Sequence, residues 1–425
     1  MAHLDARTGY DHLIGRLNRF PQGAPDSKSL RGILGILMSE EEAAVIARLP
    51  IKPFTAAQAA RALKMKPAEA RKILDRLASR CLLLDTTGRT RDLYVLPPPM
   101  AGFFEFSMMR LRGDIDQKLL AELLHQYINV EEDFITALFG METKLGRAFV
   151  HEPVLTAENA LHTLDYERAS EVIRTAEHRG VGVCYCRHKM GHMGKACDAP
   201  LDICMTFSNT AAALIKHGYA RSVDAKEGLD LLQQAYDRNL VQFGENVRRE
   251  VSFICNCCGC CCEALIAARR LGSLRAIHTT NFIPRIDRET CTGCAECAAV
   301  CPVEAMGLVS ANDPQRPRKK TARVDESICI GCGVCVRVCK QKSLGLALRP
   351  ARVITPLDSV HKAVLMAVEK GMLQDLIFDN RALWSHRAMA AILGVLLKMP
   401  PLKQALASKQ MKSRYFEALI LRMKS

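Results

Sequence analysis

The sequence predicts a mainly α-helical protein with α+β parts, divided into several domains, and three observations support this prediction. A chain of 425 residues is too long for one ordinary core. Apolar residues recur at helical spacing in many segments, such as residues 117–124 and 169–178. Eighteen of the nineteen cysteines lie between Cys184 and Cys339, so one part of the chain differs in chemistry from the rest.

Composition and charge restrict the class of protein further. With 49% hydrophobic and 24% charged residues, the chain is neither disordered nor fibrous. The formal net charge of +14 favours acidic protein partners, nucleic acid or a membrane surface. The first residues have no basic start followed by an apolar stretch, so we expect no secretory signal. The longest apolar run, residues 388–397, is about half of what a membrane span needs. We therefore expect a cytoplasmic protein without a transmembrane segment, in which dense cysteines indicate metal rather than disulfides.

Changes in composition along the chain give the predicted domain boundaries. Residues 97–99 are three prolines and form a predicted linker. The predicted parts are a helical lead-in (1–40), a helix–turn–helix domain (41–100), a helical, cysteine-rich middle domain (101–280), a domain of duplicated cysteine runs (281–350) and a basic helical tail (351–425).

The segment after the lead-in is predicted to form two helices and a hairpin. Thr55 can cap a helix at residues 55–63, and Pro67 opens a second helix at residues 67–80. Two short apolar stretches around a turn follow in residues 81–96, which is typical of a hairpin. This order resembles the winged helix-turn-helix of the MarR-like regulators.

The winged-helix resemblance implies an alternative function, a redox-sensing transcription regulator that binds DNA. Four basic residues of the second helix could contact a duplex: Arg71, Lys72, Arg76 and Arg80. The start of that helix, residues 67–70, offers few side chains that read bases. Because winged helices also serve as protein–protein modules, docking is favoured over DNA binding. Cys81, at the junction of helix and hairpin, is expected to be a small buried residue.

Two cysteine runs of equal spacing between residues 286 and 348 indicate an internal duplication. The first run has the spacing C-x2-C-x2-C-x3-C-P, and the second repeats it with Lys340 in place of the proline. These runs resemble the bacterial two-cluster ferredoxin domain. The resemblance implies that one [4Fe–4S] cluster is held by Cys291, Cys294, Cys297 and Cys339. It implies that the other is held by Cys329, Cys332, Cys335 and Cys301.

The spacing of the runs suits a cluster because a short loop lets three thiolates contact three irons of one cube. Zinc is the disfavoured alternative, because two complete runs of four cysteines are unusually specific for iron–sulfur clusters. The connection between the runs includes a basic stretch at residues 316–320. It is expected to be a solvated surface loop, and the alternative is a hairpin that docks an acidic partner.

Ten further cysteines form two tight groups before the duplicated runs. They are Cys184, Cys186, Cys197, Cys204, Cys255, Cys257, Cys258, Cys260, Cys261 and Cys262. The last of them precedes a predicted helix, whose N-terminal dipole lowers thiol pKa values. We expect at least one further iron–sulfur cluster here, with zinc or free thiols as alternatives. His188 and His192 are close in sequence, but we expect them to face solvent rather than bind metal.

As a whole, the chain resembles multi-domain 4Fe–4S ferredoxin-type proteins of anaerobic bacteria, which implies electron transfer. No nucleotide-binding or flavin-binding fingerprint occurs, so electrons are expected to pass to and from partner proteins, acidic ones in particular. A substrate reductase acting at the middle cysteines is a further alternative. In the tail, Met389, Ile392, Leu393, Leu396 and Leu397 form an apolar stripe that could lie on a membrane or pack against the protein.

Overall fold

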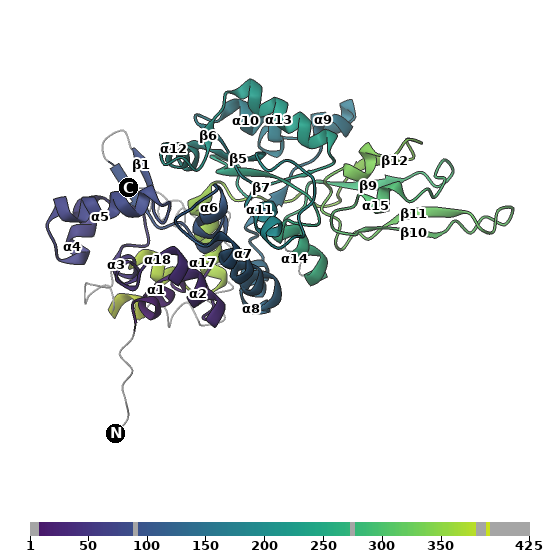
Figure 1. Ribbon diagram of the computed structural model, residues 1–425. Coiled ribbons are helices and arrows are strands. Elements are labelled where there is room, and N and C mark those ends of the chain that lie inside the picture. The colour runs from purple at the N-terminus through teal and green to yellow at the C-terminus, as the bar shows by residue number, and fades with distance from the viewer. Residues whose placement is uncertain (1–7, 88–91, 273–276, 380–387, 392–425) are drawn as a thin grey trace. The chain divides into compact units, whose positions relative to one another are not determined.

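The structure, a computed structural model, describes residues 8–87, 92–272, 277–379 and 388–391 (Figure 1). The chain forms two compact units. Unit 1 comprises residues 1–143, 212–220 and 359–425, and unit 2 comprises residues 144–211 and 221–358. All eighteen clustered cysteines belong to unit 2, whereas Cys81 lies in unit 1, where it is buried as predicted. Most of the predicted apolar stripe of the tail, including Ile392, lies outside the described residues.

Unit 1 consists mainly of helices. They are α1 (Gly9–Leu17), α2 (Lys28–Leu37), α3 (Glu40–Arg48), α4 (Ala56–Leu63), α5 (Pro67–Ser79), α6 (Phe104–Met108), α7 (Gln117–His125), α8 (Glu132–Phe139), α17 (Ser359–Glu369) and α18 (Leu373–Ile377). Helix α12 (Ser208–Lys216) begins in unit 2 and ends in unit 1. The apolar faces of these helices supply the core, as the spacing of their apolar residues predicts.

The two helices and the hairpin after the lead-in lie where the sequence predicts them. The side chain of Thr55 caps α4 by accepting the N–H of Gln58, and Pro67 opens α5. Strands β1 (Leu84–Thr87) and β2 (Asp92–Val95) then pair in antiparallel fashion. Phe54 adds a bridge to this hairpin at Tyr94.

Unit 2 contains a six-stranded antiparallel sheet in the order β3-β7-β8-β5-β4-β6. Its strands are β3 (Gly146–Ala148), β4 (Arg179–Gly182), β5 (Cys204–Phe207), β6 (Arg221–Ser222), β7 (Val241–Glu245) and β8 (Phe253–Cys257). Helices α10 (Ala169–Thr175) and α13 (Ala225–Asp237) pack together and share a core with the sheet, which includes Phe207, Ile254 and Tyr236. The expectation of a helical middle domain was therefore wrong in part, because the sheet lies at its centre.

The remaining helices of this part are α9 (Ala157–Leu161), α11 (Tyr185–His192) and α14 (Glu263–Leu271). Cys184 is the residue before α11, and Cys262 is the residue before α14. Each helix therefore begins directly after a cysteine, and α11 follows the end of β4 while α14 follows the end of β8.

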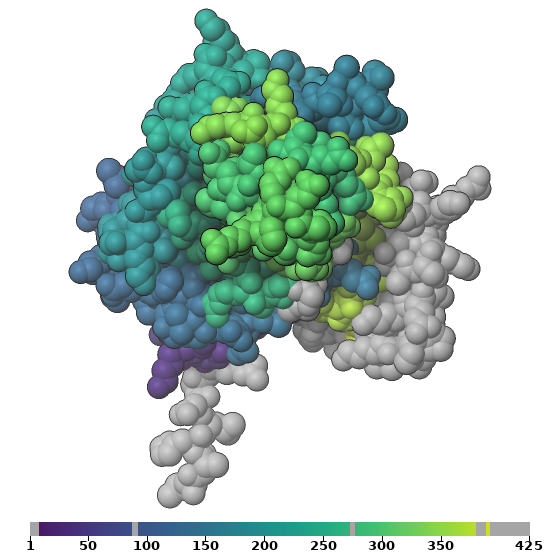
Figure 2. Space-filling view, turned by 90° about the vertical axis from the view of Figure 1, so that its right-hand side faces the viewer, coloured from purple at the N-terminus to yellow at the C-terminus, as the bar shows by residue number. Residues whose placement is uncertain are grey.

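The duplicated cysteine runs form a small α+β arrangement with approximate internal symmetry. Strand β9 (Phe282–Ile286) pairs with β12 (Leu344–Leu348), and β10 (Met306–Ser310) pairs with β11 (Lys320–Val324). Each run ends in a short helix, α15 (Glu296–Ala299) or α16 (Val334–Arg337), and the two helices are in contact. The β10–β11 hairpin, with its basic stretch, extends away from the cysteines and points toward the viewer in Figure 2.

Candidate functional site

The four cysteines assigned to the first cluster line one cavity. Its volume is about 80 Å³, and its walls include Cys291, Cys294 and Cys297 of the first run together with Cys339 of the second. The backbone N–H of Ala322 donates a hydrogen bond of 3.4 Å to the sulfur of Cys291. A hollow lined by four sulfur atoms, one of which accepts a backbone N–H, fits a [4Fe–4S] cluster.

The four cysteines assigned to the second cluster also lie near one another, and three of them are buried. Burial raises the pKa of the Cys335 thiol well above its usual value, and the charges of Cys332, Cys329 and Cys301 raise it further. The N–H of Ala305 donates to the sulfur of Cys301 over 3.2 Å. Because metal binds thiolates, loading this site releases protons that the buried thiols otherwise hold.

Glycines let the backbone come close to each cysteine loop. Gly293 has φ +68°, and a Cβ atom there would lie 2.4 Å from the carbonyl oxygen of Lys320. Gly331 occupies the equivalent place in the second run, with φ +70° and a Cβ position 2.2 Å from the carbonyl oxygen of Phe282. A side chain at either position would push the loop off the neighbouring strand.

The ten middle cysteines divide into two sets. The first, which we call the four-thiol group, comprises Cys197, Cys258, Cys260 and Cys261. The second, the six-thiol group, comprises Cys184, Cys186, Cys204, Cys255, Cys257 and Cys262. Residues adjacent in sequence, Cys257 and Cys258 or Cys261 and Cys262, thus belong to different sets. This division differs from the two groups that the sequence suggests, because each set takes cysteines from both groups.

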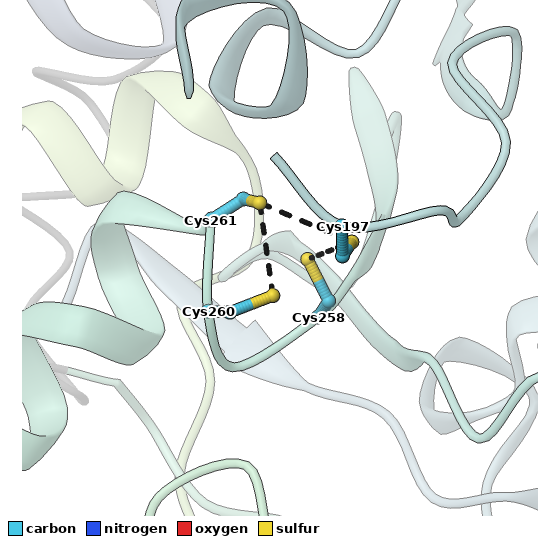
Figure 3. Close-up of side chains that lie close together, drawn as sticks. All are labelled: Cys197, Cys258, Cys260 and Cys261. Carbon is cyan, nitrogen blue, oxygen red and sulfur yellow. Dashed lines mark hydrogen bonds between the residues drawn. The ribbon is translucent and has the colours of Figure 1, made fainter. Parts of the chain in front are cut away.

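The four-thiol group is compact, and its sulfur atoms face one another (Figure 3). All four sulfurs lie within 4.8 Å of one another. The sulfur of Cys197 is 3.5 Å from that of Cys258 and 3.9 Å from that of Cys261, which is 3.7 Å from that of Cys260. Hydrogen bonding from Cys261 lowers the pKa of Cys258 to about 4. This group could hold a metal ion.

The six-thiol group is a chain of contacting thiols at one end of the sheet. Each member of the chain shifts the thiol pKa of the next, in the order Cys184, Cys204, Cys255, Cys257, Cys262, Cys186. They come from the ends of the adjacent strands β4, β5 and β8 and from the starts of α11 and α14. Four of them are only 5–7% exposed, and Cys186 and Cys255 are half-buried.

Arg187 lies between the two sets of thiols and is 1% exposed. Its guanidinium donates to the carbonyl oxygens of Pro200 and Asn256 and to the sulfur of Cys258, which is 3.5 Å away. Burial lowers the pKa of Arg187, but the charges of Cys184 and Cys258 outweigh burial and raise it. A buried cation needs an anion nearby, so this arginine favours ionised sulfur on both sides.

Two further buried charges flank the six-thiol group. Lys189 and Glu263 form an ion pair in which both side chains are at most 1% exposed. Lys189 lies one helical turn after Cys186, and Glu263 directly follows Cys262. Sequence reasoning missed Arg187, Lys189 and Glu263, because charged residues are almost always exposed and no pattern distinguishes these three.

His188 and His192 lie on α11 and contact each other. Their Nε2 atoms are 3.2 Å apart. His188 is buried and His192 is half-buried, so the expectation that both face solvent does not hold for His188.

The loop of the four-thiol group lies against the dicluster segment. Gly259 stands between Cys258 and Cys260, and a Cβ atom there would lie 2.7 Å from the carbonyl oxygen of Pro302. Pro302 directly follows Cys301, one of the cysteines assigned to the second cluster. The backbones of the two cysteine-rich parts therefore touch inside unit 2.

The basic residues of α5 are largely engaged within unit 1. Arg71 pairs with Asp92 at 2.8 Å and with Asp75 at 3.4 Å. Arg80 pairs with Glu42 at 2.8 Å, and Arg76 is 3.7 Å from the same carboxylate. Lys72 is exposed.

Comparisons with known proteins assign one part of the chain. In the part of the chain that the structure describes, no helix is long and apolar enough to cross a membrane. The comparisons with curated proteins and with solved structures gave no match. Residues 283–340 match the family model of the 4Fe-4S dicluster domain, which implies two [4Fe–4S] clusters and electron transfer in this segment.

Proposed function

We propose that this protein is an iron–sulfur electron-transfer protein, or the electron-transfer subunit of a redox enzyme, in which the dicluster domain exchanges electrons with the cysteine-rich centre of unit 2. The match at residues 283–340 and the two sets of four cysteines support the first half of this proposal. When bound, such clusters supply one-electron chemistry at potentials that depend on sulfur hydrogen bonds and solvent exposure.

The observation that carries the second half is the contact between Gly259 and Pro302. It brings the loop of the four-thiol group against the residue that follows Cys301. Electron transfer slows steeply with distance, so direct backbone contact between two metal-binding segments favours exchange between them. A glycine is needed there because any larger residue would meet the Pro302 backbone.

Differences in exposure suggest a direction for this path. Cys294 of the first set is exposed, whereas Cys329, Cys332 and Cys335 of the second set are buried. The first site is thus the more accessible to a partner protein, and the second adjoins the cysteine-rich centre through Cys301. We propose that electrons enter at the first site and continue through the second.

The distances within the four-thiol group support a single tetrahedral ion there. A metal–sulfur bond of about 2.3 Å gives sulfur–sulfur edges of about 3.8 Å in a regular tetrahedron. The measured separations of 3.5, 3.7 and 3.9 Å agree with this value. Tetrahedral sites of four thiolates suit zinc or iron.

Gly259→Ala tests the proposed path. In the anaerobically purified full chain, sub-stoichiometric dithionite followed by freeze-quench EPR measures how fast electrons redistribute between the dicluster domain and the centre. We expect redistribution to slow several-fold in Gly259→Ala, with unchanged iron content. The matched control is Gly307→Ala, because no atom lies within 4 Å of a Cβ atom at Gly307. Equal rates in both variants and the native chain would show that this contact carries no electrons.

The regulator alternative has less support than electron transfer. DNA binding needs free cations on the recognition helix, and Arg71 and Arg80 of α5 are paired with carboxylates of the same unit. These pairs favour the docking role for the winged-helix-like segment.

The reductase alternative depends on a different observation. Cys260 is the exposed member of the four-thiol group. A substrate would therefore approach the metal from the Cys260 side.

A further inference from the structure

The six-thiol group lies apart from the four-thiol group and from the dicluster segment, and packing alone does not account for it. Six thiols in one unbroken chain of contacts are far more than a core needs. They are shielded from solvent and surrounded by buried charges. Buried polar groups of this kind are stable only when each has a partner.

The balance of buried charge requires anionic sulfur beside this group. Lys189 and Glu263 neutralise each other. The guanidinium of Arg187 has as hydrogen-bond partners two neutral carbonyl oxygens and the sulfur of Cys258, and it also interacts with Cys184. A buried cation with only neutral partners is strongly disfavoured. Ionised Cys258 supplies negative charge to Arg187 from the four-thiol group, and a metal-bound thiolate at Cys184 would supply it from the six-thiol group.

The arrangement of the six sulfurs differs from that of a single-ion site. Among the described residues, only the four-thiol group has three or more ligand atoms that all lie within 4.8 Å of one another. The six sulfurs instead follow one another as a chain, so the group as a whole spans more than one tetrahedron. The eight cysteines of the dicluster segment are also more widely spaced than the four-thiol group. That segment matches a domain that binds [4Fe–4S] clusters, so wider spacing is compatible with a cluster.

We propose that the six-thiol group holds a polynuclear iron–sulfur cluster of its own, separate from the dicluster domain and from the metal of the four-thiol group. One oxidised [4Fe–4S] cluster is made from two ferrous ions, two ferric ions and four sulfides, so its assembly from these ions transfers no electron. Each ligating thiol releases its proton to solvent as its sulfur binds iron. Six thiols exceed the four that one [4Fe–4S] cluster takes. The expected minimum is therefore one such cluster.

Adjacent cysteines of one loop provide matched variants. Cys257→Ser and Cys262→Ser change the six-thiol group, whereas Cys258→Ser and Cys261→Ser change the four-thiol group one residue away. Each full chain is purified anaerobically, reconstituted with ferrous and ferric iron and sulfide, and assayed for iron, zinc and acid-labile sulfide. We expect the first pair to lose about four irons and about four sulfides per chain. The second pair should lose about one metal ion and no sulfide.

The native chain provides a measurement that needs no variant. It should contain about four or more sulfides beyond the roughly eight of two [4Fe–4S] clusters. A native chain with only the sulfide of the dicluster domain would overturn the proposal. Equal losses in all four variants would also overturn it, because they would indicate one shared centre.

Two controls distinguish the loss of a cluster from misfolding and from disulfide formation. The EPR signals of the dicluster domain report whether each variant is folded. Thiol titration of the denatured chain, before and after reduction, reveals whether the six cysteines are disulfides, which would exclude the cluster. Metal and sulfide counts do not depend on electron exchange. The cluster proposal can therefore fail while the proposed function holds, and the proposed function can fail while the cluster proposal holds.

Discussion

Asp85 is a buried carboxylate whose charge is balanced by two side chains distant in sequence. It is 8% exposed and pairs with Lys216, while its other oxygen lies 2.8 Å from Nε2 of His217. Burial alone would raise the pKa of Asp85, but the hydrogen bonds with Lys216 and His217 outweigh burial and lower it. Strand β1 is thereby tied to residues 212–220 of unit 1.

Asp85→Asn should destabilise unit 1 by about 2 kcal/mol, because it removes a buried charge that pairs with Lys216 and hydrogen-bonds to His217. The pKa of Asp85 is lower in the folded state than its ordinary value of 3.8. The ionised carboxylate therefore stabilises the fold at pH values above 3.8, and this stabilisation is lost as the pH falls through the folded-state pKa. The deficit of the variant should therefore be constant near neutral pH and shrink below about pH 4. Urea denaturation followed by circular dichroism measures it.

Asp92→Asn is the control, because Asp92 also pairs with an arginine but its side chain is 39% exposed. An exposed ion pair contributes at most about 1 kcal/mol. Equal deficits in the two variants would contradict the role assigned to burial at Asp85.

Single residues also mark where sequence reasoning stops. Cys255 and Cys257 lie on one face of strand β8, which ends at Cys257, so a known strand would have grouped these two and left Cys258 outside it. The sequence around them, rich in cysteine and glycine, does not identify a strand. The burial of Arg187 follows from the fold alone, since an arginine beside His188 and Lys189 predicts a solvated helix face.

At the scale of elements, the two cysteine loops of the dicluster segment depend on glycine. Gly293→Ala and Gly331→Ala would each force a loop away from its neighbouring strand. We expect each variant to lose one cluster, or about four irons per chain, and to keep the other. Iron analysis of the full chain measures the loss.

Gly345→Ala is the matched control for these loops, because Gly345 also lies in the dicluster segment and has open space at its Cβ position. Its iron content should equal that of the native chain. Loss of both clusters in every glycine variant would instead indicate general unfolding of the segment.

Helices were predicted better than strands, and burial explains the difference. Helices α4, α5, α7 and α10 lie close to their predicted ranges, because their apolar residues recur on one face. A side-chain cap marks the start of α4, and a proline marks the start of α5. Strands β5 and β7 are buried at every position, so they lack the alternation that identifies a half-exposed strand. The six-stranded sheet, and with it the division of the ten cysteines, was therefore not predictable from periodicity.

At the scale of the whole molecule, the net charge of +14 bears on its partners. Exposed cations gather on the β10–β11 hairpin of unit 2, where Arg316, Arg318 and Lys320 are exposed. A positive surface accelerates association with a negatively charged partner, and salt screens this attraction over about 10 Å at 0.1 M. We propose that this hairpin attracts an acidic redox protein.

Electron exchange with an acidic ferredoxin should therefore slow as ionic strength rises. Replacing Arg316, Arg318 and Lys320 by glutamate should slow it further at low salt, by about tenfold or more. Stopped-flow absorbance measures the rate. The same replacement of Arg61, Lys64 and Lys66, which are exposed on unit 1, should have a smaller effect. A rate independent of salt would exclude electrostatic attraction as the basis of partner choice.

The exchange of ligands between the two cysteine runs has a consequence for biosynthesis. The cavity of the first run takes its fourth cysteine, Cys339, from the end of the second. The second site is therefore complete once Cys335 is made, and the first site only once Cys339 is made. The last of the ten middle cysteines, Cys262, is made roughly 80 residues before Cys339. At translation rates of about 5–20 residues per second, this interval is roughly 4–16 s. The middle centre can acquire metal first, while the thiols of the first run remain without metal. In a growing cell exposed to oxygen, the nascent dicluster segment should therefore be oxidised before any other part of the chain.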